Sequence, residues 1–366
     1  MHIFCVEDGK NLQIQNENII YHKYAARKGF FNKVIKHSFF WNQHNQLYDI
    51  VLNRIRKLEI HYIIAHDLPT LKPALKIKNK IGAPLLYDSL EIYTETINQF
   101  FPKVSGPKKI ISMFLIRFMR YFGARSEGKM MLSCEKITTV NNSLATYFSK
   151  KYRVDHIEVI MNCPRTKNCI PENVDFRNLY GFKKKDSLFI YQGVLNEGRG
   201  LNLLIKAFSK ISKSHNDIKL IILGDGVLKS KLNEQVNEFG LNETVVFHDS
   251  VVYDRLLEYT VAADFGVNLL EAFNLSKKYA SPNKLFEYMQ AGLPVLCSYS
   301  PENNLIFNKY NIGIQCKNEV EDISKKIIEL KNLKDSSKQK ISTELLKAKE
   351  IYCWENQEFK LFELIQ

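Results

Sequence analysis

The chain lacks any apolar run that could cross a membrane. Its most apolar segment, residues 110–122, is interrupted by Arg117 and Arg120 and is too short for a hydrocarbon core of about 30 Å. No basic stretch followed by a long apolar run opens the chain, so the sequence predicts no signal peptide. Paired cysteines are missing too: the seven cysteines are scattered without a C-x-x-C pair. This usage favours reduced thiols in a cytoplasmic protein and implies no metal site.

The sequence also lacks a G-x-G-x-x-G or Walker loop, an internal repeat, and any recognition-helix or RNA-binding motif. A formal net charge of +13 and a pI near 9.2 still favour an anionic partner, which could be a small phosphate, anionic lipid or nucleic acid. Charge alone does not choose among these three. A hydrophobic content of 45% and a charged content of 25% are typical of a soluble globular protein.

Short apolar runs alternate with amphipathic stretches along the 366 residues, which is the pattern of parallel α/β sheets. The expected strands are residues 2–5, 60–64, 84–87, 136–140 and 157–160 in the first half, and 188–192, 219–223, 245–248, 264–268 and 295–298 in the second. Helices are expected at 201–212, at 227–239 and from 319 onward. The length suits two doubly wound domains, over residues 1–165 and 186–352, joined by a polar linker over 166–185.

The most informative segment begins at Ser281 and continues as S-P-N-K-L-F-E-Y-M-Q-A-G-L-P-V. Ser281 suits an N-cap, Pro282 the first helical position and Gly292 the C-terminal stop, which predicts a helix over 282–291. Free backbone N–H groups at its first turn, with Lys284 as a mobile charge, would favour a phosphate.

In the same helix Lys284 and Glu287 are three residues apart, and Asn283 and Glu287 are four apart. This spacing places them on one face, away from the apolar side chains of the helix. The two oxygens of Glu287 could accept from two vicinal hydroxyls, as on a ribose. The alternative is a surface helix with an ordinary Lys/Glu pair.

Two glycine-rich turns follow expected strands of the second half. Gly193, Gly198 and Gly200 would let a phosphate approach the backbone, with Arg199 donating to a diphosphate. Gly224, in a Gly-Asp-Gly turn, lies at an equivalent sheet position. Each turn alone could equally be an ordinary loop.

Polar residues also follow expected strands of the first half, namely His66 and Asp67 after one strand and Asp88 and Glu91 after the next. Polar loops at the strand ends of two facing domains predict a cleft between them. For His66 and Asp88 taken singly, helix capping or loop hydrogen bonding is the simpler interpretation.

The stretch from Lys103 to Lys129 interleaves basic residues with aliphatic and aromatic ones. A basic helix with an aromatic face can lie on an anionic membrane. A packed helix with a solvated basic face is the other interpretation, and both stay open.

Together these motifs resemble the GT-B glycosyltransferases of family 4, the retaining, nucleotide-sugar-dependent group common in bacterial surface-polysaccharide synthesis. The resemblance rests on residues 64–71 (IAHDLPTL), 86–91 (LYDSLE), 137–141 (ITTVN), 159–164 (VIMNCP), 192–201 (QGVLNEGRGL), 223–226 (LGDG), 262–267 (AADFGV), 281–295 and 354–358 (WENQE). It covers almost the whole chain. It implies that residues 353–366 form a closing helix that crosses back to the first domain.

The resemblance implies donor binding by the second domain and acceptor binding by the first. Arg199 matches the basic position of the family's phosphate loop, and Glu287 matches the glutamate that holds the ribose hydroxyls. The implied donor-binding set is Gly193, Arg199, Gly200, Gly224, Ser281, Asn283, Lys284 and Glu287. The implied acceptor side is His66, Asp67, Asp88 and Glu91, with Asp88, Glu91 and His66 as catalytic candidates. No metal or other cofactor is expected.

The chain departs from the family pattern at several positions. Tyr279 stands where the first glutamate of the paired motif belongs, Val194 replaces a frequent arginine, and Leu90 replaces a histidine. The usual first β-loop-α unit is not apparent, so either the true start lies upstream or the enzyme is shortened.

The expected function is sugar transfer with retention from a UDP- or GDP-sugar to a surface-glycan acceptor, free or lipid-linked, by a hexosyl- or N-acetylhexosaminyl-type enzyme. The expected location is the cytoplasm, with or without peripheral attachment to the inner face of the plasma membrane, and nucleic acid is not an expected partner. A GT-B sugar-nucleotide epimerase and a non-catalytic subunit of a glycan synthase stay open.

Overall fold

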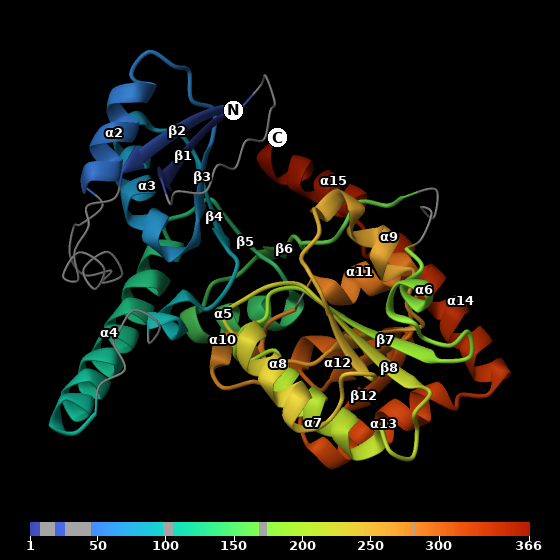
Figure 1. The fold of residues 1–366 in the computed structure, drawn as a ribbon. Coiled ribbons are helices and arrows are strands. Elements are labelled where there is room, and N and C mark those ends of the chain that lie inside the picture. The colour runs from blue at the N-terminus through green and yellow to red at the C-terminus, as the bar shows by residue number, and fades with distance from the viewer. Residues whose placement is uncertain (8–18, 26–44, 98–104, 168–173, 282) are drawn as a thin grey trace. The chain divides into compact units, whose positions relative to one another are not determined.

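The computed structural model describes residues 1–7, 19–25, 45–97, 105–167, 174–281 and 283–366 (Figure 1). The chain divides into two compact units. Unit 1 comprises residues 1–139 with 145–158, and unit 2 comprises residues 140–144 with 159–366. Within the expected linker, residues 168–173 lie outside the described part, while helix α6 (Phe176–Tyr180) belongs to unit 2. The domain boundaries set by sequence stay a prediction.

The main sheet of unit 1 has the order β3-β4-β5-β6, formed by β3 (Ile63–His66), β4 (Leu85–Ser89), β5 (Lys136–Thr139) and β6 (Ile157–Val159). β4 pairs in parallel with both β3 and β5. Because carboxyl ends of parallel strands meet at one edge, His66, Asp88 and Thr138 become neighbours. A separate parallel pair joins β1 (His2–Glu7) to β2 (Ile20–Ala25), a strand that the sequence did not predict.

Unit 1 carries the helices α2 (Asn45–Ile55), α3 (Asp67–Ile81), η1 (Tyr93–Glu95) and α4 (Pro107–Met131), together with α5 (Asn142–Tyr152) from Ala145 onward. The second half of α4 is anchored by Glu127, a fully buried carboxyl that accepts hydrogen bonds from Tyr87 (2.9 Å) and Tyr152 (2.7 Å). The first half of α4 is exposed along apolar and basic side chains alike.

Unit 2 contains a six-stranded parallel sheet. Its strands are β7 (Ser187–Gln192), β8 (Ile218–Leu223), β9 (Val245–His248), β10 (Phe265–Asn268), β11 (Val295–Ser298) and β12 (Gly313–Cys316), in the order β12-β11-β10-β7-β8-β9. The inner strands β11, β10, β7 and β8 are almost wholly buried, as expected of a parallel sheet, whereas most residues of the edge strands β9 and β12 are only partly buried. The strand order reverses between β7 and β10, which is where open α/β sheets bind ligands.

Helices cover both faces of this sheet (Figure 1). The helices of unit 2 not yet named are α7 (Leu201–Ile211), α8 (Lys229–Glu238), η3 (Tyr253–Arg255), α9 (Leu256–Thr260), α10 (Leu275–Lys278), α11 (Lys284–Ala291), α12 (Pro301–Lys309), α13 (Val320–Lys331), α14 (Asp335–Ile351) and α15 (Trp354–Ile365). α7 and α13 contribute to one apolar core, and α11 and α14 to the other.

The predicted α/β class with parallel sheets is confirmed, and β12 joins β2 as a strand that the sequence did not predict. α15 lies in unit 2, where Gln357 accepts a hydrogen bond from the backbone N–H of Met161 (2.9 Å). Its expected crossing to the first domain stays a prediction. No helix in the described ranges is long and apolar enough to span a bilayer.

Two backbone hydrogen bonds join the turns after β7 and β8. They run from Gly193 N–H to Leu223 O (2.9 Å) and from Leu195 N–H to Asp225 O (2.8 Å). Gly224 makes this approach possible. Its φ is +145°, and a Cβ there would overlap the carbonyl oxygen of Gly193.

We expect Gly224→Ala to lower the free energy of unfolding by about 3 kcal/mol, because backbone strain adds to overpacking. The control is Gly240→Ala, where φ is +64° and no atom lies within 4 Å of the added methyl group. There only the left-handed strain remains, about 1 kcal/mol. Denaturant unfolding measures both, and equal losses would contradict the proposed clash.

Candidate functional site

A buried tyrosine fixes α11 over the carboxyl ends of the central strands. The Tyr288 hydroxyl lies 3.1 Å from the carbonyl of Ile190 and 3.2 Å from that of Val267, and it accepts from the N–H of Gln192 (3.3 Å). Its ring lies over Gly266, where a Cβ would come within 2.5 Å of the ring. The first turn of the helix therefore places Glu287 against Gln192 at the end of β7 and Lys284 against Gly193 in the turn that follows.

The predicted start of this helix is wrong. α11 begins at Lys284, and Asn283, in the N-cap position, already has helical dihedrals and makes no capping bond through its side chain. Ser281 is therefore too far ahead to cap the helix, and its buried hydroxyl has no hydrogen-bond partner in the described part of the chain. Pro282 lies outside the described residues. The predicted stop is confirmed, since Gly292 is left-handed (φ +70°).

Lys284 is not the mobile charge that the sequence predicted. The residue is only 7% exposed, and Nζ lies 3.7 Å from the ring centroid of Tyr191. Nζ has no hydrogen-bond acceptor among the described residues, and a Cβ on Gly193 would lie 3.7 Å from it. Burial, and secondly the Arg199 charge, holds the pKa of Lys284 well below its usual range, whereas Glu287 opposes the shift. An anion placed here would favour the charged form of Lys284, which burial disfavours.

Glu287 is half-buried and held in one orientation. Its Oε2 accepts from the Gln192 side-chain amide (2.6 Å), whose oxygen in turn accepts from the hydroxyl of Thr260 (2.9 Å). Burial raises the pKa of Glu287, while the Gln192 bond and Lys284 act against that rise. The carboxylate keeps further lone pairs for ligand hydroxyls.

Glu287 also lines a cavity of about 710 Å³ that lies wholly within unit 2. Asn283, which is exposed, lines the same cavity, as do Thr260, Tyr253 and Trp354. The space is wide enough for a small organic ligand. Unit 2 thus offers a carboxylate at the edge of a cavity and a buried cation one turn earlier on the same helix.

The glycine turn after β7 acts through shape more than through free donors. Gly193, Gly198 and Gly200 all have positive φ. The Gly200 N–H is taken by the carboxylate of Glu271 (3.1 Å), that of Gly193 by Leu223 O, and that of Gly224 by His248 O. These three amides are therefore already hydrogen-bonded within the protein, although the glycines still let a ligand lie close to the backbone.

Arg199 supplies the second cation of this region. It is half-buried. Its charge adds to the effect of burial that lowers the pKa of Lys284, and it opposes the rise that burial causes in the pKa of Tyr191. Within the described ranges, no carboxylate lies within ion-pairing distance of its guanidinium. Arg199 is thus close enough to Lys284 for its charge to act on it, and Lys284 lies beside Gly193; a diphosphate could accept hydrogen bonds from both basic side chains.

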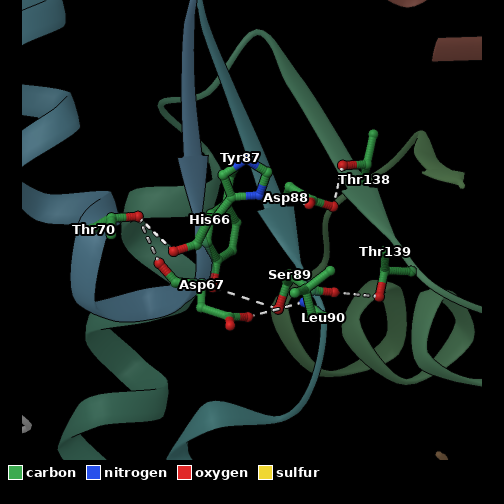
Figure 2. A network of polar contacts seen from close by, with 9 residues as sticks. All are labelled: His66, Asp67, Thr70, Tyr87, Asp88, Ser89, Leu90, Thr138 and Thr139. Carbon is green, nitrogen blue, oxygen red and sulfur yellow. Dashed lines mark hydrogen bonds and ion pairs between the residues drawn. The ribbon is translucent and has the colours of Figure 1, made fainter. Parts of the chain in front are cut away.

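The polar residues of unit 1 form a second constellation (Figure 2). His66 Nδ1 lies 2.9 Å from Asp88 Oδ2, and Asp88 Oδ1 accepts from the hydroxyl of Thr138 (2.8 Å). The hydrogen bond to Asp88 raises the pKa of His66. The His66 side chain is 64% exposed and that of Asp88 19%. The carboxylate therefore orients the ring, and the ring is the member that can meet a ligand.

Asp67 stands beside this pair. Its backbone is left-handed (φ +59°), and its Oδ1 accepts from the N–H of Leu90 (3.0 Å), as Figure 2 shows. Burial, with the nearby charges of Glu91 and Asp88, raises the pKa of Asp67 to about 6. A carboxyl that titrates near neutral pH can exchange protons at the pH of a cell. All four predicted acceptor-side residues therefore lie in one group within unit 1.

Several residues that shape these groups were not singled out from the sequence. They are Tyr191, Gln192, Thr260 and Glu271 in unit 2, and Thr138 in unit 1. Gln192 had a readable signal, because it is a polar residue that ends an apolar strand just before a glycine. Thr260 and Glu271 had none, since their partners are distant in sequence.

Residues 174–344 match the model of the family described as glycosyl transferases group 1. An uncharacterised glycosyltransferase of Methanocaldococcus jannaschii is 37% identical over 95 residues, which are 26% of this chain and 21% of that protein. An N-acetylgalactosamine-N,N'-diacetylbacillosaminyl-diphospho-undecaprenol 4-alpha-N-acetylgalactosaminyltransferase of Campylobacter jejuni is 36% identical over 75 residues, 20% of either chain. The matched segments thus span about a fifth of these relatives.

Among solved structures, Anabaena Alr3699/HepE in complex with UDP superposes with a TM-score of 0.68 at 13% identity, over 94% of this chain and 85% of that one. At this identity the likeness concerns the fold, which is the GT-B fold of glycosyltransferases.

The His66–Asp88 pair predicts a measurable titration. We expect Asp88→Asn to lower the pKa of His66 toward its ordinary value, because the main cause of the rise is removed; NMR of the ring protons measures this, with the other histidines as internal reference. The stability that the pair supplies, no more than about 1 kcal/mol at this exposure, is present at low pH and lost as pH rises through the pKa of His66. An unchanged titration would contradict the pairing.

Proposed function

We propose that this chain, which belongs to the group 1 glycosyltransferases and has the GT-B fold, transfers a sugar with retention from a UDP- or GDP-sugar to a surface-glycan acceptor. The observation that carries the proposal is the grouping of Lys284, Arg199 and Glu287 where the strand order of the six-stranded sheet reverses. Two cations and a carboxylate at that point suit a ligand that has both a diphosphate and a sugar diol.

In this proposal the diphosphate lies against Gly193 between Arg199 and Lys284. The two cations neutralise charge that builds on the leaving phosphate as the bond to the sugar breaks. Glu287, oriented by Gln192, accepts from the ribose hydroxyls, and the cavity beside it takes the rest of the nucleoside. Gly200 and Gly224 shape the turns, while Asn283 and Ser281 are candidates for contacts with the sugar.

The acceptor side is proposed to use the group around His66. Asp88 orients the exposed imidazole of His66, and Asp67 and Glu91 add carboxylates beside it. Such a group suits hydrogen bonding to the hydroxyls of a glycan. The Campylobacter jejuni relative is named for transfer to a diphospho-undecaprenol-linked sugar, which supports a lipid-linked acceptor for this chain. The transferred unit is proposed to be a hexosyl or N-acetylhexosaminyl group.

Substitutions at the donor side should separate the residues proposed to bind the diphosphate from the one proposed to bind the ribose diol. We first identify which of UDP and GDP raises the unfolding temperature, because a ligand stabilises according to its occupancy. Arg199→Ala and Lys284→Met should each weaken binding of that nucleotide about tenfold to a hundredfold, the range of a lost charged hydrogen bond, and leave the weaker binding of the free nucleoside unchanged.

Glu287→Ala should weaken nucleotide and nucleoside alike, because the diol is common to both. The matched control is Glu258→Ala, which removes a carboxylate from α9 that pairs with Arg255 instead. Unchanged nucleotide affinity in all three site variants would sink the assignment. Product analysis with a donor alone would detect an epimerase, which needs no acceptor.

The exposed first half of α4 supports peripheral binding to an anionic membrane. Apolar side chains there stay in solvent, including Ile110 (72% exposed), Ile111, Met113 and Phe114 (69%). Lys108, Lys109 and Arg117 lie among them and are exposed. A surface that joins apolar and basic side chains on one helix suits the boundary between lipid head groups and acyl chains. Lys103, in the predicted stretch, lies outside the described residues.

Charge reversal of Lys108, Lys109 and Arg117 to Glu should weaken binding to phosphatidylglycerol vesicles about a hundredfold, at about 1 kcal/mol for each cation near the surface. A sedimentation assay at fixed salt measures this. Reversal of Lys183, Lys184 and Lys185 in unit 2 is the control with equal charge change. If both triple variants lose the same affinity, the effect is one of net charge and α4 is not the membrane surface.

A further inference from the structure

A second cavity, of about 540 Å³, lies wholly within unit 1 beside the second half of α4. Its walls come from α4, η1 and the end of α5. Four cations line it, and the lining includes a single carboxylate; these residues are Arg120, Arg125, Lys129, Lys151 and Glu95. The formal charge of the lining is therefore +3, concentrated in one concave space.

Little of this charge is compensated by the protein. Glu95 forms an ion pair with Arg120, in which its Oε2 lies 3.5 Å from the guanidinium. The Arg120 Nε is buried and has no hydrogen-bond partner in the described part of the chain. Within the same described ranges, Arg125 and Lys129 have no carboxylate within 4.0 Å.

Lys151 and the buried Glu127 are the remaining charged residues in and behind the wall of the cavity. Lys151 Nζ donates to the hydroxyl of Tyr147, and burial lowers its pKa. Glu127 lies behind Tyr152, where burial raises its pKa to about 6. One carboxylate behind the wall reduces the excess of positive charge but does not cancel it. The cavity is therefore suited to an anion with more than one negative charge.

The same face of α4 connects the cavity to the apolar surface. Ile110, Phe114, Tyr121 and Arg125 are spaced by four, seven and four residues, which places them in one stripe along a helix. The stripe is exposed and apolar for its first turns, and at Tyr121 and Arg125 it becomes the wall of the cavity. A ligand with an apolar chain and a multivalent anionic head group would fit the apolar stripe and the basic cavity at its end.

We propose that this cavity binds the diphosphate of a lipid-linked acceptor, with the lipid chain lying along Ile110 and Phe114. The proposal rests on the proposed transferase function and names the part of the acceptor that unit 1 recognises. A diphosphate diester carries two negative charges and can accept hydrogen bonds from several cations at once. The single charge of a phospholipid diester would leave most of the +3 lining uncompensated. Arg125 and Lys129 are then acceptor-positioning residues.

The test uses the whole chain and neutral phosphatidylcholine vesicles that contain a sugar-capped polyprenyl diphosphate (a diester), polyprenyl monophosphate or phosphatidylglycerol at equal total charge. We expect the unaltered protein to bind the diphosphate vesicles at least tenfold more tightly than the other two. Arg125→Gln with Lys129→Gln should remove this preference, because each exposed cation contributes about tenfold. The control, Lys108→Gln with Lys109→Gln, should weaken binding to all three vesicles and keep the preference.

Equal binding of the unaltered protein to the diphosphate and phosphatidylglycerol vesicles would overturn the proposal, as would equal loss of preference in the control. Inorganic diphosphate provides a further arm. If inorganic diphosphate is as effective as polyprenyl diphosphate in displacing the protein from the vesicles, the lipid chain contributes nothing to binding. The proposed binding mode, with the lipid chain along α4, is then wrong. Nucleotide binding by unit 2 is measured in parallel: its absence would count against the proposed function, whereas a lost diphosphate preference with intact nucleotide binding would count only against this inference.

Discussion

The candidate donor side depends on how the hydroxyl of Tyr288 is held. That hydroxyl meets the carbonyls of Ile190 and Val267 and the N–H of Gln192, so one side chain ties α11 to both β7 and β10. The ring can lie there only because Gly266 has no side chain beneath it. Glu287 is the residue just before Tyr288, and Lys284 is one turn earlier. Their positions over the sheet therefore follow from the tyrosine anchor more than from the start of the helix.

Two places in the described part of the chain bring basic side chains together with fewer carboxylates than cations. Beside β7, Lys284 is buried near the charge of Arg199 and has no hydrogen-bond acceptor among the described residues, an arrangement that favours an anion. Beside α4, the charge is more exposed and spread over Arg120, Arg125 and Lys129. The net charge of +13 is thus not a uniform property of the surface. Part of it is placed where small or lipid-borne phosphates could neutralise it.

Much of the fold could be predicted from the apolar runs, because strands buried on both faces need continuous apolar residues. β2 and β12 were missed, since residues 20–25 contain His22 and Lys23 and residues 313–316 are short and contain Gln315. The assignment of the predicted site residues to a donor and an acceptor site stays a prediction, and the states of several of them were not foreseen. Lys284 is buried and not mobile, Ser281 does not cap α11, and the amides of Gly193, Gly200 and Gly224 are already hydrogen-bonded.

The sequence by itself determined the α/β class, the position of the helix stop at Gly292 and the residues that carry charge after each strand, because these depend on local periodicity and on neighbours along the chain. Only the tertiary structure decided which of those residues meet. Glu287 accepts a hydrogen bond from Gln192, which lies on a strand 95 residues away in sequence, and His66 is hydrogen-bonded to Asp88 on the neighbouring strand. Burial and pairing depend on such distant neighbours, and they set the pKa values of Asp67 and Lys284 and the charge of the cavity beside α4.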